Sequence, residues 1–317
     1  MNTPTSPIDV IICTRDRRAD LARCLQSIEI QRPLPSRVIV VIGSEDSTLP
    51  DMQDRFPLLS IEVVECFEHN ISIARNAGLE HAQAEIVLFL DDDAQARPGW
   101  VQAYIDAFHA KPKAWAIGGK VFDSRNAPPT IEFSHGLISA SGRQIPVWKD
   151  GGKAPRNYLA NVKGCNFGIR RAAVMEIGGF DPFFAFAFDE SDLILSIHGT
   201  GGQVLHESGA IVDHAHTPGH YRLADPLDRD WRVEYASHTM FMLKHVSGVH
   251  RVFGRLVIRR RLAKLIVLAG WEVIQGRISV HRFAEIFQSA NRGIRDACQA
   301  YATRREQLCQ QVSAVER

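Results

Sequence analysis

Hydrophobic and polar positions follow two different periods along the first 220 residues, and these periods predict alternating helices and strands. Apolar residues recur three and four positions apart at residues 21–28 and 101–108, which we expect to be helices with one buried face. Residues 71–81, which are dominated by small residues, are a further predicted helix. Short runs of β-branched and large apolar residues are typical of strands buried on both faces, and they occupy residues 8–13, 37–42, 61–66, 85–90 and 115–119. This order predicts an α/β fold with a mostly parallel sheet and helices on both of its faces.

The pattern weakens between residues 120 and 161, where paired prolines and paired glycines indicate an insertion or a hairpin. Two further helices and a last short strand are predicted after it, at residues 171–177, 189–198 and 210–212. Beyond Gly219 the alternation of strands stops and the sequence favours helices. We therefore expect an α/β domain of residues 1–220, followed by a mainly helical extension of residues 221–317.

Three consecutive acids, Asp91, Asp92 and Asp93, directly follow the apolar run 85–90. The carboxyl ends of strands are where open α/β sheets bind their ligands. Adjacent carboxylates repel one another, and a hard divalent cation with oxygen ligands removes that cost. In an extended chain Asp91 and Asp93 would share one side and Asp92 would face elsewhere. The alternative is a solvated acidic loop or a helix cap before Pro98, but the buried run favours the cation site.

Several motifs together resemble the family 2 glycosyltransferases of the GT-A fold, over about residues 8–216. The motifs are the opening strand and loop at 8–17, an Ala-Arg-Asn-x-Gly helix at 74–78, the Asp-x-Asp motif at 91–93, an acceptor-side segment at 164–181 and an acidic pair at 189–190. Each motif is weak alone, but five in this order and spacing are specific. The resemblance implies a Rossmann-like GT-A domain with a nucleotide-sugar half at about 1–119 and an acceptor half at about 120–220.

The chain departs from the family pattern at the end of the second predicted strand. The family usually has there an aspartate that holds the nucleotide, whereas this chain has Ile42. We expect Glu45 or Asp46 to take over this role, which leaves the identity of the nucleotide base open.

The acidic pair is a second departure, because the family commonly shows Glu-Asp with the aspartate as catalytic base. This chain has Asp189-Glu190, so Glu190 is the expected base, with Asp192 as the second choice and Asp189 beside them. A carboxylate opposite the leaving group would take the proton from the attacking hydroxyl. The alternative is structural, since acids in the first turn of a helix cap it and suit its dipole.

The nucleotide is expected at the end of the first strand, where Thr14, Arg15 and Asp16 lie. The resemblance also places Arg75 and Asn76 at the nucleotide or its diphosphate, and a planar guanidinium suits phosphate oxygens. Alternatively, Arg75 pairs with the acidic triplet and stabilises the fold.

The expected metal ligands are Asp93 and Asp91, with Asp92 close to the donor. The resemblance adds His214, because the family often has a histidine there that completes the metal or diphosphate site. Neutral imidazole and carboxylates are suitable ligands for manganese. We therefore expect Mn²⁺ or Mg²⁺ as cofactor.

These features predict a metal-dependent, inverting glycosyltransferase that moves a sugar from a nucleoside diphosphate sugar to a hydroxyl of a glycan, a lipid-linked or another acceptor, in polysaccharide or glycoconjugate synthesis. A sugar nucleotidyltransferase is one alternative, but it requires a glycine-rich phosphate loop, and residues 14–17 contain no glycine. A non-catalytic nucleotide-sugar-binding module of the same fold is another. Donor hydrolysis that requires metal would separate enzyme from binder.

Charge and cysteine content narrow the partners and the location. The net charge of +1 gives no general attraction to nucleic acid, so no such partner is expected. Six scattered cysteines without ligand or disulfide spacing favour a reducing compartment. The first residues lack the features of a signal peptide, and no apolar run reaches the ~18 residues of a membrane span. We expect a cytoplasmic protein, with the inner face of the membrane as a possible site of action.

The helical extension contains a basic cluster, Arg259-Arg260-Arg261, next to an apolar stripe. That stripe consists of Ile258, Leu262, Leu265 and Ala269. It predicts either an interfacial helix in peripheral contact with a membrane or a helix that packs on its neighbours with solvated basic flanks. Packing is favoured, and the extension is also a candidate for self-association.

Overall fold

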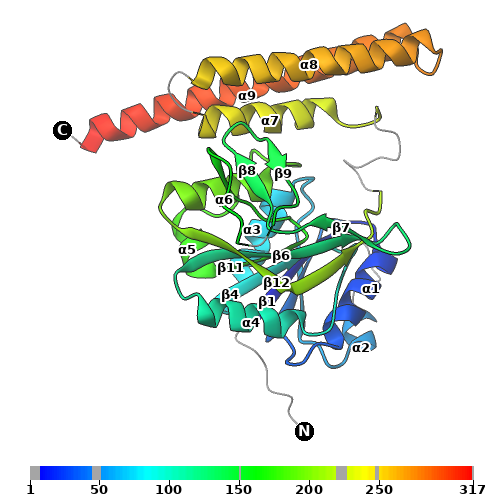
Figure 1. The fold of residues 1–317 in the computed structure, drawn as a ribbon, viewed down its shortest axis with the longest axis vertical. Coiled ribbons are helices and arrows are strands. Elements are labelled where there is room, and N and C mark those ends of the chain that lie inside the picture. The colour runs from blue at the N-terminus through cyan, green and yellow to red at the C-terminus, as the bar shows by residue number, and fades with distance from the viewer. Residues whose placement is uncertain (1–7, 45–50, 150, 219–226, 247–249, 316–317) are drawn as a thin grey trace. The chain divides into compact units, whose positions relative to one another are not determined.

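The computed structural model describes residues 8–44, 51–149, 151–218, 227–246 and 250–315. The chain forms two compact units (Figure 1). An α/β unit contains Met1–Ser139, Gln144–Ala185 and Asp189–Thr217, and a helical unit contains Ala140–Arg143, Phe186–Phe188 and Pro218–Arg317. The expected boundary at residue 220 lies outside the described residues, as do Glu45 and Asp46.

The main sheet of the α/β unit has the strand order β3-β2-β1-β4-β11-β6-β12-β5, with β7 paired to β6. Its first four strands are parallel and confirm the predicted runs; they are β1 (Ile8–Thr14), β2 (Arg37–Ile42), β3 (Ile61–Glu65) and β4 (Ile86–Leu90). Because β1 and β4 are neighbours and run in the same direction, Thr14 and Asp91 emerge at the same edge of the sheet.

The other half of this sheet is mixed in direction. Strand β11 (Asn166–Arg170) lies antiparallel between β4 and β6 (Ala114–Asp123), and β12 (Gln203–His214) is parallel to β6. The short strand β5 (Ala94–Ala96) is antiparallel to β12, and β7 (Thr130–Phe133) is antiparallel to β6. The last strand is therefore longer than the predicted 210–212, and β5 and β11 were not predicted.

Helices cover both faces of the sheet, as the alternation of segments predicts (Figure 1). One buried apolar cluster joins a sheet face to α1 (Arg18–Glu29), α2 (Asp51–Arg55) and α4 (Trp100–Ala110). A second cluster joins the opposite face to α3 (Ile71–His81), α5 (Arg171–Glu176) and α6 (Asp189–Gly199). Alternate residues of β1 follow the strand period, because Val10 and Ile12 belong to the first cluster and Ile11 to the second.

The segment with weak periodicity, residues 120–161, contains β7 and a separate small sheet. This sheet has the order β10-β8-β9, with β8 (Leu137–Ser139), β9 (Gln144–Ile145) and β10 (Tyr158–Ala160) all antiparallel. Of the predicted alternatives, an insertion or a hairpin, the structure shows a hairpin, formed by β8 and β9.

The helical unit consists of α7 (Trp231–His245), α8 (His250–Ile274) and α9 (Val280–Val315) in its described part. Its apolar cluster contains Leu227, Trp231, Tyr235, Leu265, Ile286 and Ala290. Backbones of α7 and α9 approach closely, because a Cβ at Gly293 would lie only 2.1 Å from the backbone oxygen of Arg232. A side chain at that position would force the two helices apart.

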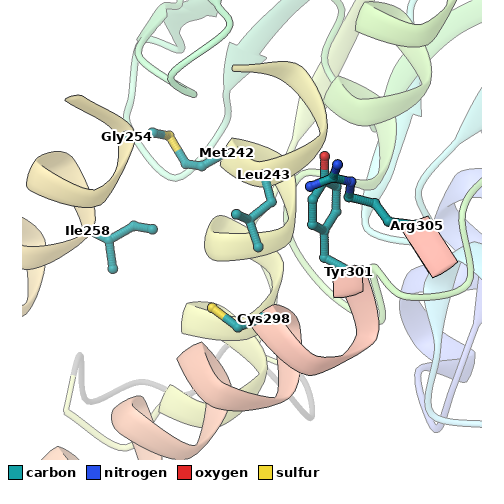
Figure 2. Close-up of a pocket in the computed structure, with 7 residues that line it drawn as sticks. All are labelled: Met242, Leu243, Gly254, Ile258, Cys298, Tyr301 and Arg305. Atoms are coloured by element: carbon teal, nitrogen blue, oxygen red, sulfur yellow. The ribbon is translucent and has the colours of Figure 1, made fainter. Parts of the chain in front are cut away.

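A cavity of about 230 Å³ lies within the helical unit (Figure 2). Residues of all three helices line it: Met242, Leu243, Gly254, Ile258, Cys298, Tyr301 and Arg305. No helix in the described part of the chain combines the length and apolar character needed to cross a membrane.

Candidate active site

The acidic triplet forms a turn rather than the extended segment expected from the sequence. The backbone N–H of Ala94 donates to the carbonyl of Asp91 at 3.1 Å, which turns the chain from β4 into β5. His214, the last residue of β12, pairs in register with Ala94. The ends of β4 and β12 are thereby brought together, and with them the triplet and the histidine.

The three carboxylates differ in their nearest partners, although Arg17 lies 3.7 Å from Asp93 as well as bonding to Asp92. Asp92 accepts from the Thr14 hydroxyl at 2.8 Å and from Arg17 at 2.9 Å. Asp91 is paired with Arg75 at 3.4 Å, and Asp93 accepts from the backbone N–H of Thr217 at 2.8 Å. Burial raises the pKa of Asp92 to about 7, an effect opposed by Arg17. Asp92 is therefore held at the β1 side, while the other two carboxylates remain near the end of β12.

His214 presents its two ring nitrogens to different acids. Its Nε2 lies 3.3 Å from an oxygen of Asp93, is buried, and makes no hydrogen bond within the described part of the chain. Ligand atoms of Asp91, Cys165 and His214 all lie within 4.8 Å of one another. A buried nitrogen without a hydrogen bond, next to carboxylates, fits the ligand set of Mn²⁺.

Glu132 holds the other side of this imidazole. Its carboxylate lies 3.3 Å from Nδ1 of His214, 2.8 Å from Nε2 of His216 and 2.8 Å from Nζ of Lys163. Burial acts to raise the pKa of Glu132, but hydrogen bonds from His214, His216 and Lys163 hold it well below its usual range. When Nδ1–H donates to Glu132, the lone pair of Nε2 is directed towards Asp93 and is available to a metal ion.

Electrostatics at His214 favour positive charge. Burial by itself lowers its pKa, but the neighbouring Cys165, Asp93 and Glu132 raise it to about 12. The same field that favours an imidazolium favours a bound cation at this position.

Arg75 connects the acidic triplet to the acidic helix. Its guanidinium bonds to Asp189 at the start of α6, contacts Asp91, and donates to the carbonyl of Gly164 at 3.0 Å. Only 4% of its surface is exposed. Three aromatic rings surround it, those of Phe89, Phe167 and Phe180. The structure thus has the pairing with the triplet that the sequence left as an alternative.

Glu190 lies beside this network. Burial and the neighbouring Asp189 raise the pKa of Glu190 to about 8, against the opposing effects of Arg75 and Lys163. Glu190 is partly accessible, whereas Asp189 and Asp192 are buried. Among the three acids of α6, Glu190 is therefore the one with surface available to an acceptor.

Arg15, directly after β1, contacts the segments that follow β2 and β3. It donates to the carbonyls of Phe67 and Glu68 at 2.7 and 3.1 Å and bonds to His69 at 2.7 Å. Its side chain lies over Gly43, where a Cβ would come within 2.7 Å of Nε. Asp16 follows with a positive φ of 55°, which turns the chain out of β1.

Asn76 bonds to the segment that precedes α6. Its side-chain amide donates to the carbonyl of Phe180 at 2.7 Å and accepts from the backbone N–H of Phe180 at 2.9 Å. Both ends of the amide hold the segment before α6. The contact of Asn76 with a nucleotide stays a prediction.

Sequence reasoning missed Arg17, Glu132, Lys163 and Cys165. Arg17 bonds to Asp92 and donates to the carbonyl of Thr217 at 2.9 Å. Its position as the second basic residue after β1, two residues beyond Arg15, could have indicated this role. Lys163 and Cys165 flank the acceptor-side Gly164, and the pairing of Asn166 with Leu90 brings that segment to the triplet. Glu132 lies in the segment without periodicity and had no sequence signal.

Comparison with known proteins identifies the class. Residues 9–178 match the sequence profile described as "Glycosyl transferase family 2", and the chain belongs to this family. It is therefore a glycosyltransferase, as its motifs predicted. It is 25% identical over 221 residues to the glucosyl-dolichyl phosphate glucuronosyltransferase of Haloferax volcanii, a match that covers 65% of this chain and 68% of that relative.

Solved structures show the same fold. GalNAc-T7 with UDP, GalNAc and Mn²⁺ matches with a TM-score of 0.55 and 16% identity, over 68% of this chain and 43% of that one. The mannosyltransferase PcManGT of Pyrobaculum calidifontis, with GDP-Man and Mn²⁺, matches with a TM-score of 0.53 and 16% identity, over 93% of this chain and 88% of that one. The predicted α/β GT-A fold with a helical C-terminal region is confirmed.

Proposed function

We propose that this enzyme transfers a sugar from a nucleoside diphosphate sugar to an acceptor hydroxyl, with inversion, and that Asp91, Asp93 and His214 hold a divalent metal ion. The observation that carries the proposal is the buried Nε2 of His214, which lies beside Asp93 without a hydrogen bond in the described part of the chain. Two proteins of the same fold contain Mn²⁺ together with a nucleotide or nucleotide sugar.

Bound Mn²⁺ or Mg²⁺ would supply Lewis-acid neutralisation of the leaving diphosphate. The residues of this chain prepare the site for it. Glu132 accepts from Nδ1 of His214 and so fixes the tautomer and orientation of the ring. Lys163 and His216 hold Glu132 in turn, at 2.8 Å each. Arg17 and Thr14 keep Asp92 away from the metal ligands.

Glu190 is the proposed general base. An inverting transfer needs a carboxylate that removes the proton of the attacking hydroxyl on the side opposite the leaving group. A pKa of about 8 is close to the pH at which such a base works best. Arg75 and Lys163 lower this pKa and so stabilise the ionised form. Asp192 stays the second candidate, and Asp189 serves mainly to position Arg75.

The nucleotide is proposed to lie over the ends of β1 and β2, bordered by Arg15, Asp16 and Gly43. Arg15 is held by three residues of the loop after β3, so its guanidinium has a fixed position. The identity of the base depends further on Glu45 and Asp46.

For the acceptor we propose a lipid-linked sugar. The Haloferax relative is named for its action on glucosyl-dolichyl phosphate, a sugar carried on a lipid phosphate. A polysaccharide end is the other candidate, and the two share a sugar hydroxyl as nucleophile.

The test is a screen of nucleoside diphosphate sugars with the purified protein and Mn²⁺, measuring release of nucleoside diphosphate with and without a chelator. Release that requires metal and is abolished in Asp93→Asn is the expected result. The matched control, Glu85→Gln, alters an exposed carboxylate that pairs with Arg170 away from this site and should retain activity. Formation of pyrophosphate would identify a nucleotidyltransferase, and binding without turnover would identify a non-catalytic module.

A further inference from the structure

Helix α8 has two apolar faces, of which only one was predicted. Leu265 and Ala269, from the stripe expected in the sequence, are 5% and 1% exposed and belong to the packed interior. A second set is in solvent: Val267, Leu268, Trp271 and Ile274 are 72%, 48%, 55% and 77% exposed. Single exposed apolar residues are common, but four within eight residues of one helix mark an interaction surface.

This second set continues a basic segment of the same helix. Arg259, Arg260 and Lys264 are all exposed one to two turns before it. Residues 260, 264, 267 and 271 follow the helical period, so basic and apolar side chains share one side of α8. A shallow groove on this side is lined by Arg260, Ala263, Lys264, Val267, Leu268 and Trp271.

Negative charge is nearly absent from α8. Glu272 is the single acid between residues 250 and 274, and its carboxylate is bonded to Arg277 at 2.6 Å. We call the surface formed by Arg259, Arg260, Lys264, Val267, Leu268, Trp271 and Ile274 the α8 face. Its character is a cationic end followed by an apolar end that includes a tryptophan.

We propose that the α8 face binds the surface of an anionic phospholipid bilayer. Basic side chains would contact lipid phosphates, and Trp271 with its apolar neighbours would enter the boundary between headgroups and acyl chains. A second copy that docked through its own α8 face would bring the same cations, and the one acid of its α8 is already bonded to Arg277, so such a symmetric contact lacks complementary charge. The absence of a spanning helix among the described residues makes the contact peripheral.

Vesicle flotation of the full-length protein tests the proposal without donor or acceptor, so its outcome does not depend on sugar transfer. Wild-type protein should float with vesicles that contain phosphatidylglycerol, much less with phosphatidylcholine alone, and less as salt is added. The double variant Arg260→Gln/Lys264→Gln should lower partition by roughly 30-fold, at about 1 kcal/mol per basic residue. Trp271→Ser/Ile274→Ser should lower it by at least about 10-fold through lost apolar burial.

Two controls match these variants. Leu58→Ser changes an apolar residue of the α/β unit that is 56% exposed, and Arg292→Gln changes an exposed cation of α9; neither should alter partition. Brominated acyl chains should quench tryptophan fluorescence in the wild type and lose most of that quenching in Trp271→Phe. Equal partition to neutral and anionic vesicles, or partition unchanged in both double variants, would overturn the proposal. A dimer that dissociates in Trp271→Ser/Ile274→Ser, without vesicle binding, would show that a second copy occupies the face instead.

Discussion

The orientation of a single imidazole decides whether the proposed metal ligands can act together. His214 has Asp93 on one nitrogen and Glu132 on the other, each at 3.3 Å. Glu132 acts on the proposed site through its contact with the ring of His214, so we consider it a positioning residue. Its carboxylate collects contacts from His216 and Lys163 as well, which restrict its own rotation.

Replacing Glu132 with glutamine should therefore weaken metal binding without removing a ligand. We expect Glu132→Gln to lower Mn²⁺ affinity by about 10–100-fold, the usual effect of losing a partner of a metal-bound histidine. Calorimetric titration with Mn²⁺ alone measures this. Glu85→Gln is the control, because that exposed carboxylate pairs with Arg170 away from the site. If the variant unfolds more easily but binds Mn²⁺ as the wild type does, Glu132 supports only the fold.

Glu190 gives a prediction of pH dependence with a defined sign. A general base acts in its ionised form, and burial with the neighbouring Asp189 raises the pKa of Glu190 to about 8. The kcat/KM of the wild type should therefore rise from pH 7 to pH 9 and level off above the pKa.

The corresponding variant, Glu190→Gln, should retain donor binding, lower kcat by ~10² or more, and lose the rise with pH. Asp192→Asn is the comparison, because Asp192 is only 2% exposed and should leave the pH profile unchanged. A dead Asp192→Asn beside an active Glu190→Gln would transfer the role of base to Asp192.

At the scale of elements, the sequence predicted β1 to β4 from their apolar runs and α1, α3 and α4 as the helices between and after them, whereas the short α2 was not predicted. Strand β11 escaped prediction because its five residues contain Gly168, and its antiparallel direction depends on tertiary pairing with β4 and β6. Strand β12 was predicted too short because the polar stretch between His206 and Ile211 coincides with a shift in register. Local patterns could not supply either feature.

The site shows the same division between local and long-range information. The triplet, His214 and Glu190 were recognisable from motifs. The partners of Arg75 and Asn76 were not, because Asp189 and Phe180 are more than a hundred residues away in sequence. Glu132 was also not recognisable, since its role depends on the distant His214.

Packing between α7 and α9 leads to a prediction on two glycines. Gly293→Ala should destabilise the helical unit by at least about 1–3 kcal/mol, because its Cβ would clash with the Arg232 backbone. Gly270→Ala, in α8, meets nothing within 4 Å and should stabilise the unit by roughly 0.5–1 kcal/mol through helix propensity. Urea unfolding followed by circular dichroism measures both. Equal effects of the two variants would contradict the close approach at Gly293.

At the scale of the whole molecule, a net charge of +1 conceals an uneven distribution. Exposed cations lie together on the α8 face, while the proposed metal site in the α/β unit has the carboxylates of Asp93 and Glu132 on the two sides of His214. The two regions attract different partners: an anionic surface for the first and a metal ion with its diphosphate for the second. The overall charge alone therefore does not show that the chain has separate regions suited to an anionic surface and to a cation.

If the acceptor is lipid-linked and the α8 face binds the bilayer, transfer to a vesicle-embedded acceptor tests both proposals at once. Membrane binding raises the effective concentration of enzyme at an acceptor embedded in vesicles. Trp271→Ser/Ile274→Ser should then lower transfer to such an acceptor by about 10-fold, the same factor as its vesicle partition. Donor hydrolysis in water should be unchanged, because neither residue belongs to the catalytic site. An equal loss in both assays would mean that the variant damages the fold, and no loss in either would separate the bilayer contact from acceptor use.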